Sequence, residues 1–216
     1  MSLRTDRTAG VDTTLSFVHR FLPAERAGRP PLLLLHGTGG DENDLVDLGR
    51  ALSPGSALVS PRGKVLEGGM PRFFRRLAEG VFDEDDVRRR AGELADFVTE
   101  AREAYGLGAP VAVGFSNGAN IAAALMLLRP GVLSGAVLLR AMVPLASPPA
   151  ADLAGTPVLL LSGAMDPIVP AENATRLAGM LANAGAVVDH RTLPAGHGLS
   201  QADLSLATGW LAKRPG

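Results

Sequence analysis

Short apolar runs alternate with longer segments of helical periodicity along most of the chain. Strand-like runs occupy residues 13–22, 32–35, 57–60, 111–115, 136–139, 158–161 and 187–193. Helical spacing of apolar residues is clearest over 87–105, and an apolar helical segment covers 119–128. Strands that alternate with helices predict an α/β fold, with a mostly parallel central sheet and helices on both faces. In such sheets ligands bind at the carboxyl ends of the strands.

One segment, residues 61–82, does not follow this alternation. It is long for a loop, and it carries Met70, Phe73, Phe74 and Phe82. Long loops are usually functional or disordered, and the apolar side chains argue against disorder, so we expect a partly helical flap over a pocket. The alternative is a surface excursion whose aromatic side chains pack into the core.

With 216 residues, 46% of them hydrophobic, the whole chain predicts a single domain over 1–216.

Composition narrows the classes of partner. The formal net charge is −1 and no basic stripe is interleaved with aromatic residues, which argues against nucleic acid and anionic membrane surfaces and favours a small neutral substrate. The chain contains no cysteine, so thiolate metal sites and a cysteine nucleophile are excluded. The first eight residues are polar and no apolar stretch is long enough to span a bilayer, which predicts a soluble, cytoplasmic protein without a membrane partner.

The most informative motif lies at residues 114–118, Gly-Phe-Ser-Asn-Gly. It follows the apolar strand 111–115 and leads directly into the helical segment 119–128, which is the context of a nucleophile elbow. Such a turn holds the serine in a strained conformation, and Gly114 and Gly118 remove side chains that would block it. Ser116 is therefore the candidate nucleophile. In the alternative interpretation it is only a turn serine between two buried elements.

A serine nucleophile needs a base, and the base needs an orienting acid. In this fold the acid and the histidine follow the serine in that order. Asp166 lies just past the strand 158–161 and is the best acid, although an Asp-Pro pair can also serve only to start a turn. Asp152 precedes that strand and Asp189 lies inside the next one, so neither is placed as well.

His197 lies between two glycines after the last strand, which makes it the best base. His19 and His190 lie inside strand-like runs, where exposure at an edge or a core contact is the usual fate. His36 comes too early in the chain for the expected order, and we interpret it as a support for its own loop. The histidines show no paired spacing typical of metal ligands, so we expect no metal and no cofactor.

The glycine-rich segment 36–41 supplies another requirement of acyl transfer. Negative charge develops on the former carbonyl oxygen, and preorganised backbone N–H groups must meet it. Glycines let that backbone come close, and the N–H of Asn117, next to the nucleophile, would be the second donor. A phosphate-binding loop is excluded because the required Gly-Lys-Ser/Thr is absent.

Four motifs together resemble the carboxylesterase/phospholipase family of α/β-hydrolases, which are serine esterases. They are residues 36–45 (His-Gly-Thr-Gly-Gly-Asp-Glu-Asn-Asp-Leu), 114–118, 163–170 (Gly-Ala-Met-Asp-Pro-Ile-Val-Pro) and 196–198 (Gly-His-Gly). The resemblance implies a Ser116, Asp166 and His197 triad with an oxyanion hole at the N–H groups of Thr38 and Asn117. Members often form homodimers, so a homodimer is a possible state of this chain.

Residue 117 departs from part of that family. Acyl-protein thioesterases and lysophospholipase-like members usually have Gln where this chain has Asn117, and stretches 60–64, 69–74 and 114–120 resemble instead a bacterial branch linked to hydroquinone resistance. This difference counts against long lipid or palmitoyl-protein substrates.

The expected activity is hydrolysis of small, short-chain carboxylic esters through an acyl-enzyme on Ser116. An acyl-thioesterase or lysophospholipase with the same triad is the alternative, and a non-catalytic binding protein on the same fold is a third. No long lid insertion of the lipase type is present. We expect a small acyl pocket, walled by Met70, Phe73, Phe74, Met142 and Val143.

Overall fold

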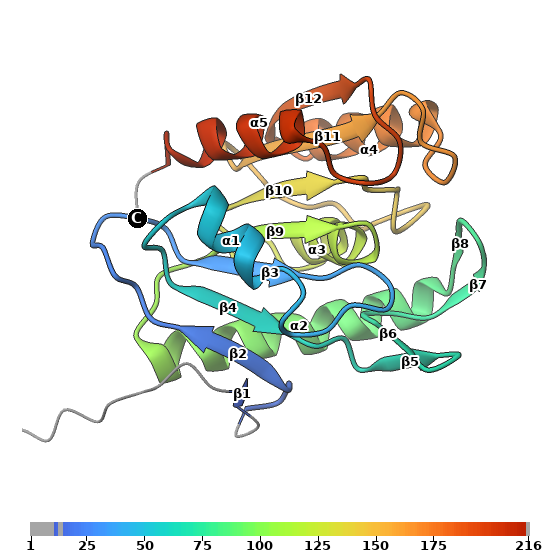
Figure 1. Cartoon of the computed structure of the whole chain (residues 1–216). Helices are drawn as coiled ribbons and strands as arrows, with labels where there is room; N and C mark the ends of the chain where they lie inside the picture. The colour runs from blue at the N-terminus through green and yellow to red at the C-terminus, as the bar shows by residue number, and fades with distance from the viewer. Residues whose placement is uncertain (1–10, 13–14, 215–216) are drawn as a thin grey trace, which may run out of the picture.

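A twisted eight-stranded sheet forms the centre of the molecule (Figure 1). The computed structural model describes the backbone of residues 11–12 and all of residues 15–214. The polar N-terminal segment 1–8 and residues 13–14 of the first predicted strand lie outside the described residues. Within the rest of that strand, regular pairing over residues 15–22 starts only at His19.

The sheet is mostly parallel, as predicted from the alternation of strands and helices. Its strand order is β1-β2-β4-β3-β9-β10-β11-β12, and only the pairings of β2 with β1 and β4 are antiparallel. The strands are β1 (Val11–Asp12), β2 (His19–Leu22), β3 (Leu32–Leu35), β4 (Leu58–Pro61), β9 (Val111–Phe115), β10 (Gly135–Leu139), β11 (Pro157–Gly163) and β12 (Val187–Leu193).

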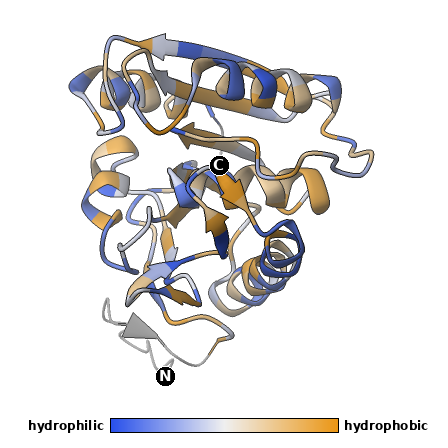
Figure 2. Ribbon diagram, turned by 90° about the vertical axis from the view of Figure 1, so that its right-hand side faces the viewer, coloured by the Kyte–Doolittle hydropathy of each residue, from blue (hydrophilic) through white to orange (hydrophobic). Residues whose placement is uncertain are grey.

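In the described part of the chain, five helices cover the two faces of this sheet. They are α1 (Val46–Leu52), α2 (Glu84–Tyr105), α3 (Asn117–Leu128), α4 (Ala171–Asn183) and α5 (Gln201–Leu211). Strand side chains alternate between the faces: Leu33 and Leu35 pack in the core with α2, α3 and α4, whereas Leu32 and Leu34 pack in the core with α1 and α5. Figure 2 shows hydrophobic colour concentrated along the strands between these layers.

The long helix α2 begins three residues before the predicted segment 87–105. Asp83 caps it, because the Asp83 carboxylate accepts a hydrogen bond from the N–H of Asp86. The helix ends where Gly106 takes a left-handed conformation with φ of 66°. The predicted end at residue 105 is confirmed.

The segment 61–82 differs from the prediction of a partly helical flap. It forms two β-hairpins, β5 (Val65–Glu67) with β6 (Met70–Arg72) and β7 (Arg76–Ala78) with β8 (Val81–Phe82), and it contains no helix. Gly68 and Gly69, between β5 and β6, have φ values of 59° and 82°. Two successive residues with positive φ favour a tight hairpin turn rather than a helix.

Candidate active site

Ser116 lies at the sharp turn between β9 and α3. Its φ of 51° and ψ of −114° are a strained combination for a residue with a side chain. The turn is fixed from both sides, because the Ser116 N–H donates to the carbonyl of Leu139 at 2.8 Å and its own carbonyl accepts from Asn120 N–H at 2.9 Å. The hydroxyl is thereby held at the carboxyl end of the sheet, at the wall of a cavity.

Two glycines make this turn sterically allowed. A Cβ atom on Gly118 would lie 1.9 Å from the carbonyl oxygen of Leu35, and one on Gly114 would lie 2.6 Å from the carbonyl oxygen of Gly118. Both contacts are with backbone atoms, which cannot move aside as a flexible side chain can. The motif thus requires glycine at both positions for packing between β3, β9 and α3.

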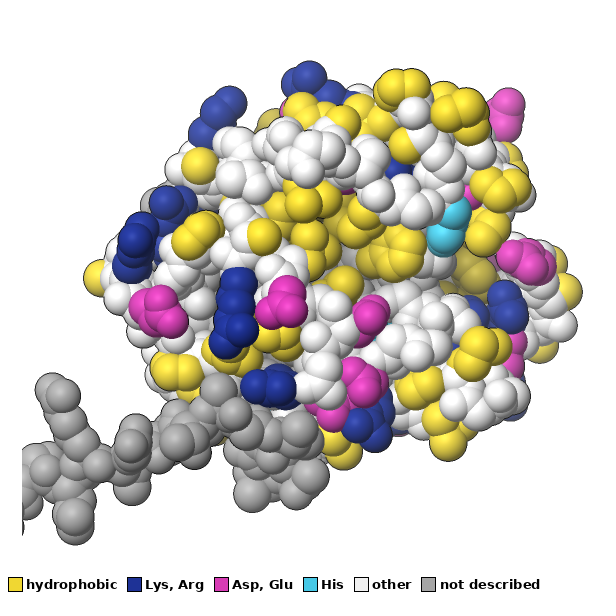
Figure 3. Space-filling model, in the orientation of Figure 1, with side chains coloured by type: hydrophobic (Ala, Val, Ile, Leu, Met, Phe, Trp, Pro, Cys, Tyr) yellow, Lys and Arg dark blue, Asp and Glu magenta, His cyan; other side chains and the backbone are white. Residues whose placement is uncertain are grey.

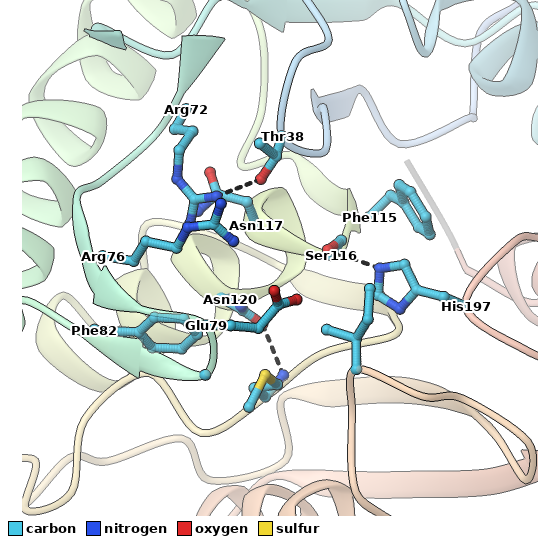
Figure 4. A pocket seen from close by; sticks show the side chains of 13 residues that line it. Thr38, Arg72, Arg76, Glu79, Phe82, Phe115, Ser116, Asn117, Asn120 and His197 are labelled. Carbon is cyan, nitrogen blue, oxygen red and sulfur yellow. Dashed lines mark hydrogen bonds between the residues drawn. The ribbon is translucent and has the colours of Figure 1, made fainter. Parts of the chain in front are cut away.

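The structure brings Ser116, His197 and Asp166 together from three separate segments. The Ser116 hydroxyl lies 3.0 Å from His197 Nε2, and His197 Nδ1 lies 2.8 Å from Asp166 Oδ2. The dashed line between Ser116 and His197 in Figure 4 marks the first of these hydrogen bonds. The Phe115 ring lies 5.4 Å from the imidazole, centroid to centroid, at 47°. These contacts form a continuous hydrogen-bond chain from a hydroxyl to a carboxylate.

The surroundings of Asp166 favour its ionised form. Burial of the carboxyl by itself would raise its pKa, but hydrogen bonds from the N–H of Ile168, from His197 and from the N–H of Val169 outweigh burial, so the pKa of Asp166 lies below its usual value. The two backbone donors lie 2.8 and 3.1 Å from Oδ1. The other oxygen, Oδ2, is free to accept a hydrogen bond from the Nδ1–H group of His197.

The two rival aspartates lie elsewhere. Asp152 accepts a hydrogen bond from the N–H of Ala154, and Asp189 forms an exposed ion pair with Arg191 at 2.9 Å on β12. Neither is hydrogen-bonded to His197.

The remaining histidines have structural contacts. His19 is buried and lies 2.8 Å from the carbonyl oxygen of Phe17, and His190 lies 2.6 Å from the hydroxyl of Ser162. Burial lowers the pKa of His190. Each therefore makes a structural contact, as expected for a histidine inside a strand-like run.

His36 supports its loop, as the sequence suggested, by joining two segments that lie 27 residues apart. Its Nδ1 donates to the carbonyl of Gly37 at 2.7 Å, and its Nε2 accepts the N–H of Gly63 at 2.9 Å. The ring is 1% exposed and packs on Phe73. Burial lowers the pKa of His36, so the neutral ring that both contacts require is the favoured form.

Thr38 and Asn117 both line the cavity beside Ser116 (Figure 4). The hydrogen bonds of the described residues include none from the backbone N–H of either residue. Their side chains are already engaged: Thr38 Oγ1 accepts from Arg72 Nη1 at 2.6 Å, and Asn117 Oδ1 accepts from the N–H of Phe73 at 2.7 Å. The segment 61–82 thus contacts both the loop after β3 and the first residue of α3.

The cavity at Ser116 has a volume of about 240 Å³. Its walls combine apolar side chains with charged side chains from β6, from β7 and from the turn between β7 and β8. The lining residues are Thr38, Arg72, Arg76, Glu79, Gly80, Phe82, Phe115, Ser116, Asn117, Asn120, Met142, Ile168 and His197.

Of the five predicted wall residues, the structure places only Met142 in this lining. Phe73 and Phe74 are 3% and 0% exposed and belong to the hydrophobic core, which matches the alternative weighed for this segment. Met70 is exposed on β6, and Val143 packs beside the core. The reason is that Phe74 points inward and meets Phe82 edge-on, with ring centroids 5.0 Å apart, so that Phe82 forms the wall instead.

Sequence reasoning missed the polar part of the wall. Arg72 is 3% exposed, and burial lowers its pKa; Glu67 lies between Arg72 and Arg76 and pairs with them at 3.3 and 2.6 Å. Glu79 points into the same space (Figure 4). Strands of two or three residues are too short for a periodic signal, so no pattern in the sequence distinguished these side chains from solvated ones.

Three further observations concern the surface charges, the metal-binding groups and the length of the helices. On the face drawn in Figure 3, Lys and Arg side chains are interspersed with Asp and Glu. In the described part of the chain, no group of three or more His, Cys, Asp and Glu could hold a metal ion. No helix among residues 15–214 is long and apolar enough to cross a membrane.

Known proteins are similar to this chain in both sequence and fold. Residues 22–214 match the family model described as phospholipase/carboxylesterase. A Bacillus subtilis (strain 168) protein, MhqD, which is described as a hydrolase, is 47% identical over 181 residues, covering 83% of this chain and 90% of its own.

Two solved carboxylesterases superpose closely on the chain. The Bacillus cereus enzyme gives a TM-score of 0.89 at 43% identity, over 92% of this chain and 94% of its own. The Mesorhizobium loti enzyme gives 0.90 at 36% identity, over 95% and 99%. The predicted α/β-hydrolase fold is thereby confirmed.

Proposed function

Because the chain belongs to the phospholipase/carboxylesterase family, we propose that it is a serine carboxylesterase in which Ser116, His197 and Asp166 are the catalytic triad. The observation that carries this proposal is the unbroken chain of hydrogen bonds, 3.0 Å from Ser116 Oγ to His197 Nε2 and 2.8 Å from His197 Nδ1 to Asp166. A hydroxyl is a weak nucleophile, and a base within such reach activates it.

The reaction follows from this geometry. His197 Nε2 takes the proton as Ser116 Oγ attacks the ester carbonyl carbon, and the resulting oxyanion accepts from the N–H groups of Thr38 and Asn117. The imidazolium then protonates the leaving alcohol, which leaves an acyl group on Ser116. A water molecule, deprotonated by His197, attacks this acyl-enzyme. As the bond to Ser116 Oγ breaks and the carboxylic acid leaves, the imidazolium returns its proton to Ser116 Oγ. Asp166 stays ionised throughout, in agreement with its lowered pKa, and stabilises the imidazolium.

We further propose that the acyl group is short. A cavity of about 240 Å³ lies below the usual range of small-molecule sites, roughly 300–1,000 Å³. Phe82, Met142 and Ile168 are the apolar side chains beside the arginines in this lining, and they offer only a limited apolar wall. Each added methylene gains up to about 0.8 kcal/mol only until such a pocket is full.

The first experiment labels the protein with a fluorophosphonate probe. Wild type should be labelled, whereas Ser116→Ala should be folded, unlabelled and lower in kcat by about 10⁶-fold, the loss typical of a removed serine nucleophile. The control is Ser205→Ala, which changes an exposed serine of α5 and should behave as wild type. Absence of labelling in folded wild type would favour the binding-protein alternative, and esterase activity of Ser116→Ala within tenfold of wild type would refute the nucleophile.

The second part of the experiment compares oxygen esters and thioesters of increasing linear acyl length. We expect kcat/KM to peak at short acyl esters and to fall well before palmitoyl, because the cavity is then full. A profile that still rises at palmitoyl, or a preference for thioesters, would favour the lysophospholipase or acyl-thioesterase alternative.

A cytoplasmic location and a homodimer remain part of the proposal. Light scattering of the purified protein, and fractionation of its native cells, would test them.

A further inference from the structure

Arg140 is the first residue after β10, and it is fully buried without being part of the triad. Its exposure is 0%, and its φ of 57° is one of two positive values among the non-glycine residues that the structure describes. A left-handed conformation is costly for a long side chain and persists where surrounding contacts enforce it. In this conformation the guanidinium contacts the histidine loop, β11 and α5.

The guanidinium of Arg140 spans the loop that carries His197. Its Nε donates to the carbonyl of Gly196 at 2.8 Å, and its Nη2 donates to the carbonyl of Gly198 at 3.0 Å. These are the carbonyls on the two sides of His197. The backbone of the histidine loop is thus held at both flanks by one planar group, which fixes the direction in which the imidazole leaves the chain.

Asp203, in the first turn of α5, balances the buried charge. Its carboxylate accepts from Arg140 Nη1 at 2.7 Å and Nη2 at 2.9 Å, and also from the N–H and hydroxyl of Ser200 at 2.8 and 2.7 Å. Burial would raise the pKa of Asp203, but these hydrogen bonds outweigh it and hold the pKa below the usual value. With a further contact from Nη1 to the carbonyl of Leu161 at 3.2 Å, the guanidinium uses its full set of five donors.

The same point of the backbone also fixes the nucleophile. The carbonyl of Leu139, directly before Arg140, accepts the N–H of Ser116 at 2.8 Å, and the N–H of Arg140 donates to the carbonyl of Leu161 at 2.9 Å. One end of β10 therefore holds the serine turn through its main chain and the histidine loop through its side chain.

We propose that Arg140, supported by Asp203, is a positioning residue that sets the distance and angle between the Ser116 hydroxyl and His197. This inference rests on the proposed triad and adds a residue to its support. A planar guanidinium can hold two carbonyls and a bidentate carboxylate at once, whereas the ammonium of lysine has three donors around a single point. Arg140→Lys should therefore keep the charge and lose the geometry.

The test compares wild type, Arg140→Lys and Ser200→Ala in ester hydrolysis and in the rate of fluorophosphonate labelling. For Arg140→Lys we expect kcat and the labelling rate to fall by about 10²-fold with KM little changed, because a misplacement near 1 Å has that effect on a catalytic group. Ser200→Ala removes a helix-capping contact of Asp203 but none of those from Arg140. It should lower the melting temperature and leave kcat within about twofold, which separates positioning from general stability.

A spectroscopic readout completes the design. In protein labelled with ¹⁵N-histidine, the Nδ1 proton resonance of His197 should move in Arg140→Lys and stay in place in Ser200→Ala, because only the former changes the imidazole orientation. If Arg140→Lys does not fold, Asp203→Asn replaces it, with a smaller fall in kcat and a shift of the same resonance expected. Folded Arg140→Lys, or in its place Asp203→Asn, with wild-type kcat and an unmoved resonance would overturn the proposal. Failure of wild type to be labelled would instead overturn the triad.

Discussion

The active-site cavity has two sides that are built differently. The strand-end side consists of the residues that follow β3, β9, β11 and β12. There the main chain of Ser116 bonds to β10, Asp166 lies in a hydrogen-bonded turn, and the loop of His197 is held by the side chain of Arg140. The hairpin side consists of residues 62–82, in which the hairpin strands have only two or three residues and pair with each other rather than with the main sheet. Its strands carry exposed apolar side chains, including Leu66 on β5 and Leu77 on β7, at 71% and 69% exposure.

This difference assigns separate tasks to the two sides. Groups that move protons need fixed distances, and the strand-end side fixes them through the elbow, the Asp166 turn and the Arg140 contacts. The hairpin side supplies Arg76, Glu79, Gly80 and Phe82 to the cavity wall from a surface segment. Surface segments accept sequence change more readily than sheet cores, so substrate selection is expected to vary there without disturbing the chemistry.

Several hydrogen bonds join the two sides. Among them, His36 accepts the N–H of Gly63, Thr38 accepts from Arg72, and Asn117 accepts from the N–H of Phe73. The proposed oxyanion donors therefore lie where the rigid sheet and the hairpins meet.

After the loss of the nucleophile itself, the largest effect is expected from the orienting acid on the strand-end side. Asp166→Asn should lower kcat by about 10⁴-fold with little change in stability, because the amide favours the wrong histidine tautomer. Asp152→Asn and Asp189→Asn are matched controls, and both should change kcat little. Steady-state kinetics of the three variants measure the difference. A greater loss of kcat in Asp189→Asn would show that Asp189, on β12, is the orienting acid.

A second comparison contrasts a buried and an exposed residue of the hairpin side. Phe74→Ala should lower the free energy of unfolding by about 3–5 kcal/mol, since a fully buried aromatic ring leaves a cavity. Leu77→Ala, three residues later and mostly exposed, should change it by no more than about 0.5 kcal/mol. Urea unfolding would measure both, and equal losses would contradict the inward direction of Phe74.

The smallest effect concerns pH and the contact between the two sides. Folded His36 stays neutral because burial lowers its pKa, whereas unfolded His36 gains a proton below about pH 6.5. The unfolded state then binds more protons, so stability falls as pH drops from about 7.5 to 5.5, by up to about 1.4 kcal/mol per pH unit from this group.

His36→Gln removes that titration. The variant should be less stable at pH 7.5, where it loses the two contacts of the ring, but its free energy of unfolding should depend less steeply on pH. His190, whose pKa burial also lowers, contributes with the same sign to both proteins and cancels in the comparison. Parallel pH profiles of wild type and variant, from urea unfolding, would exclude His36 as the source.

The amino-acid sequence by itself determined the mostly parallel sheet and the places of Ser116, Asp166 and His197 along it. Both depend on local patterns: buried runs of apolar residues define the strands, and a residue directly after a parallel strand must lie at the carboxyl edge of the sheet. The glycines at 114 and 118 belong to the same local information, because they are required by the turn itself.

Tertiary structure alone decided the surroundings of those residues. Phe73 and Phe74 turned into the core and Phe82 into the cavity, which depends on how this segment packs against the core cluster and not on its own short strands. Arg140 reaches Gly196 and Asp203 across 56 and 63 residues of sequence. Contacts at such separations arise only once the sheet has placed β10 beside β11 and α5 against it, and a local pattern carries no trace of them.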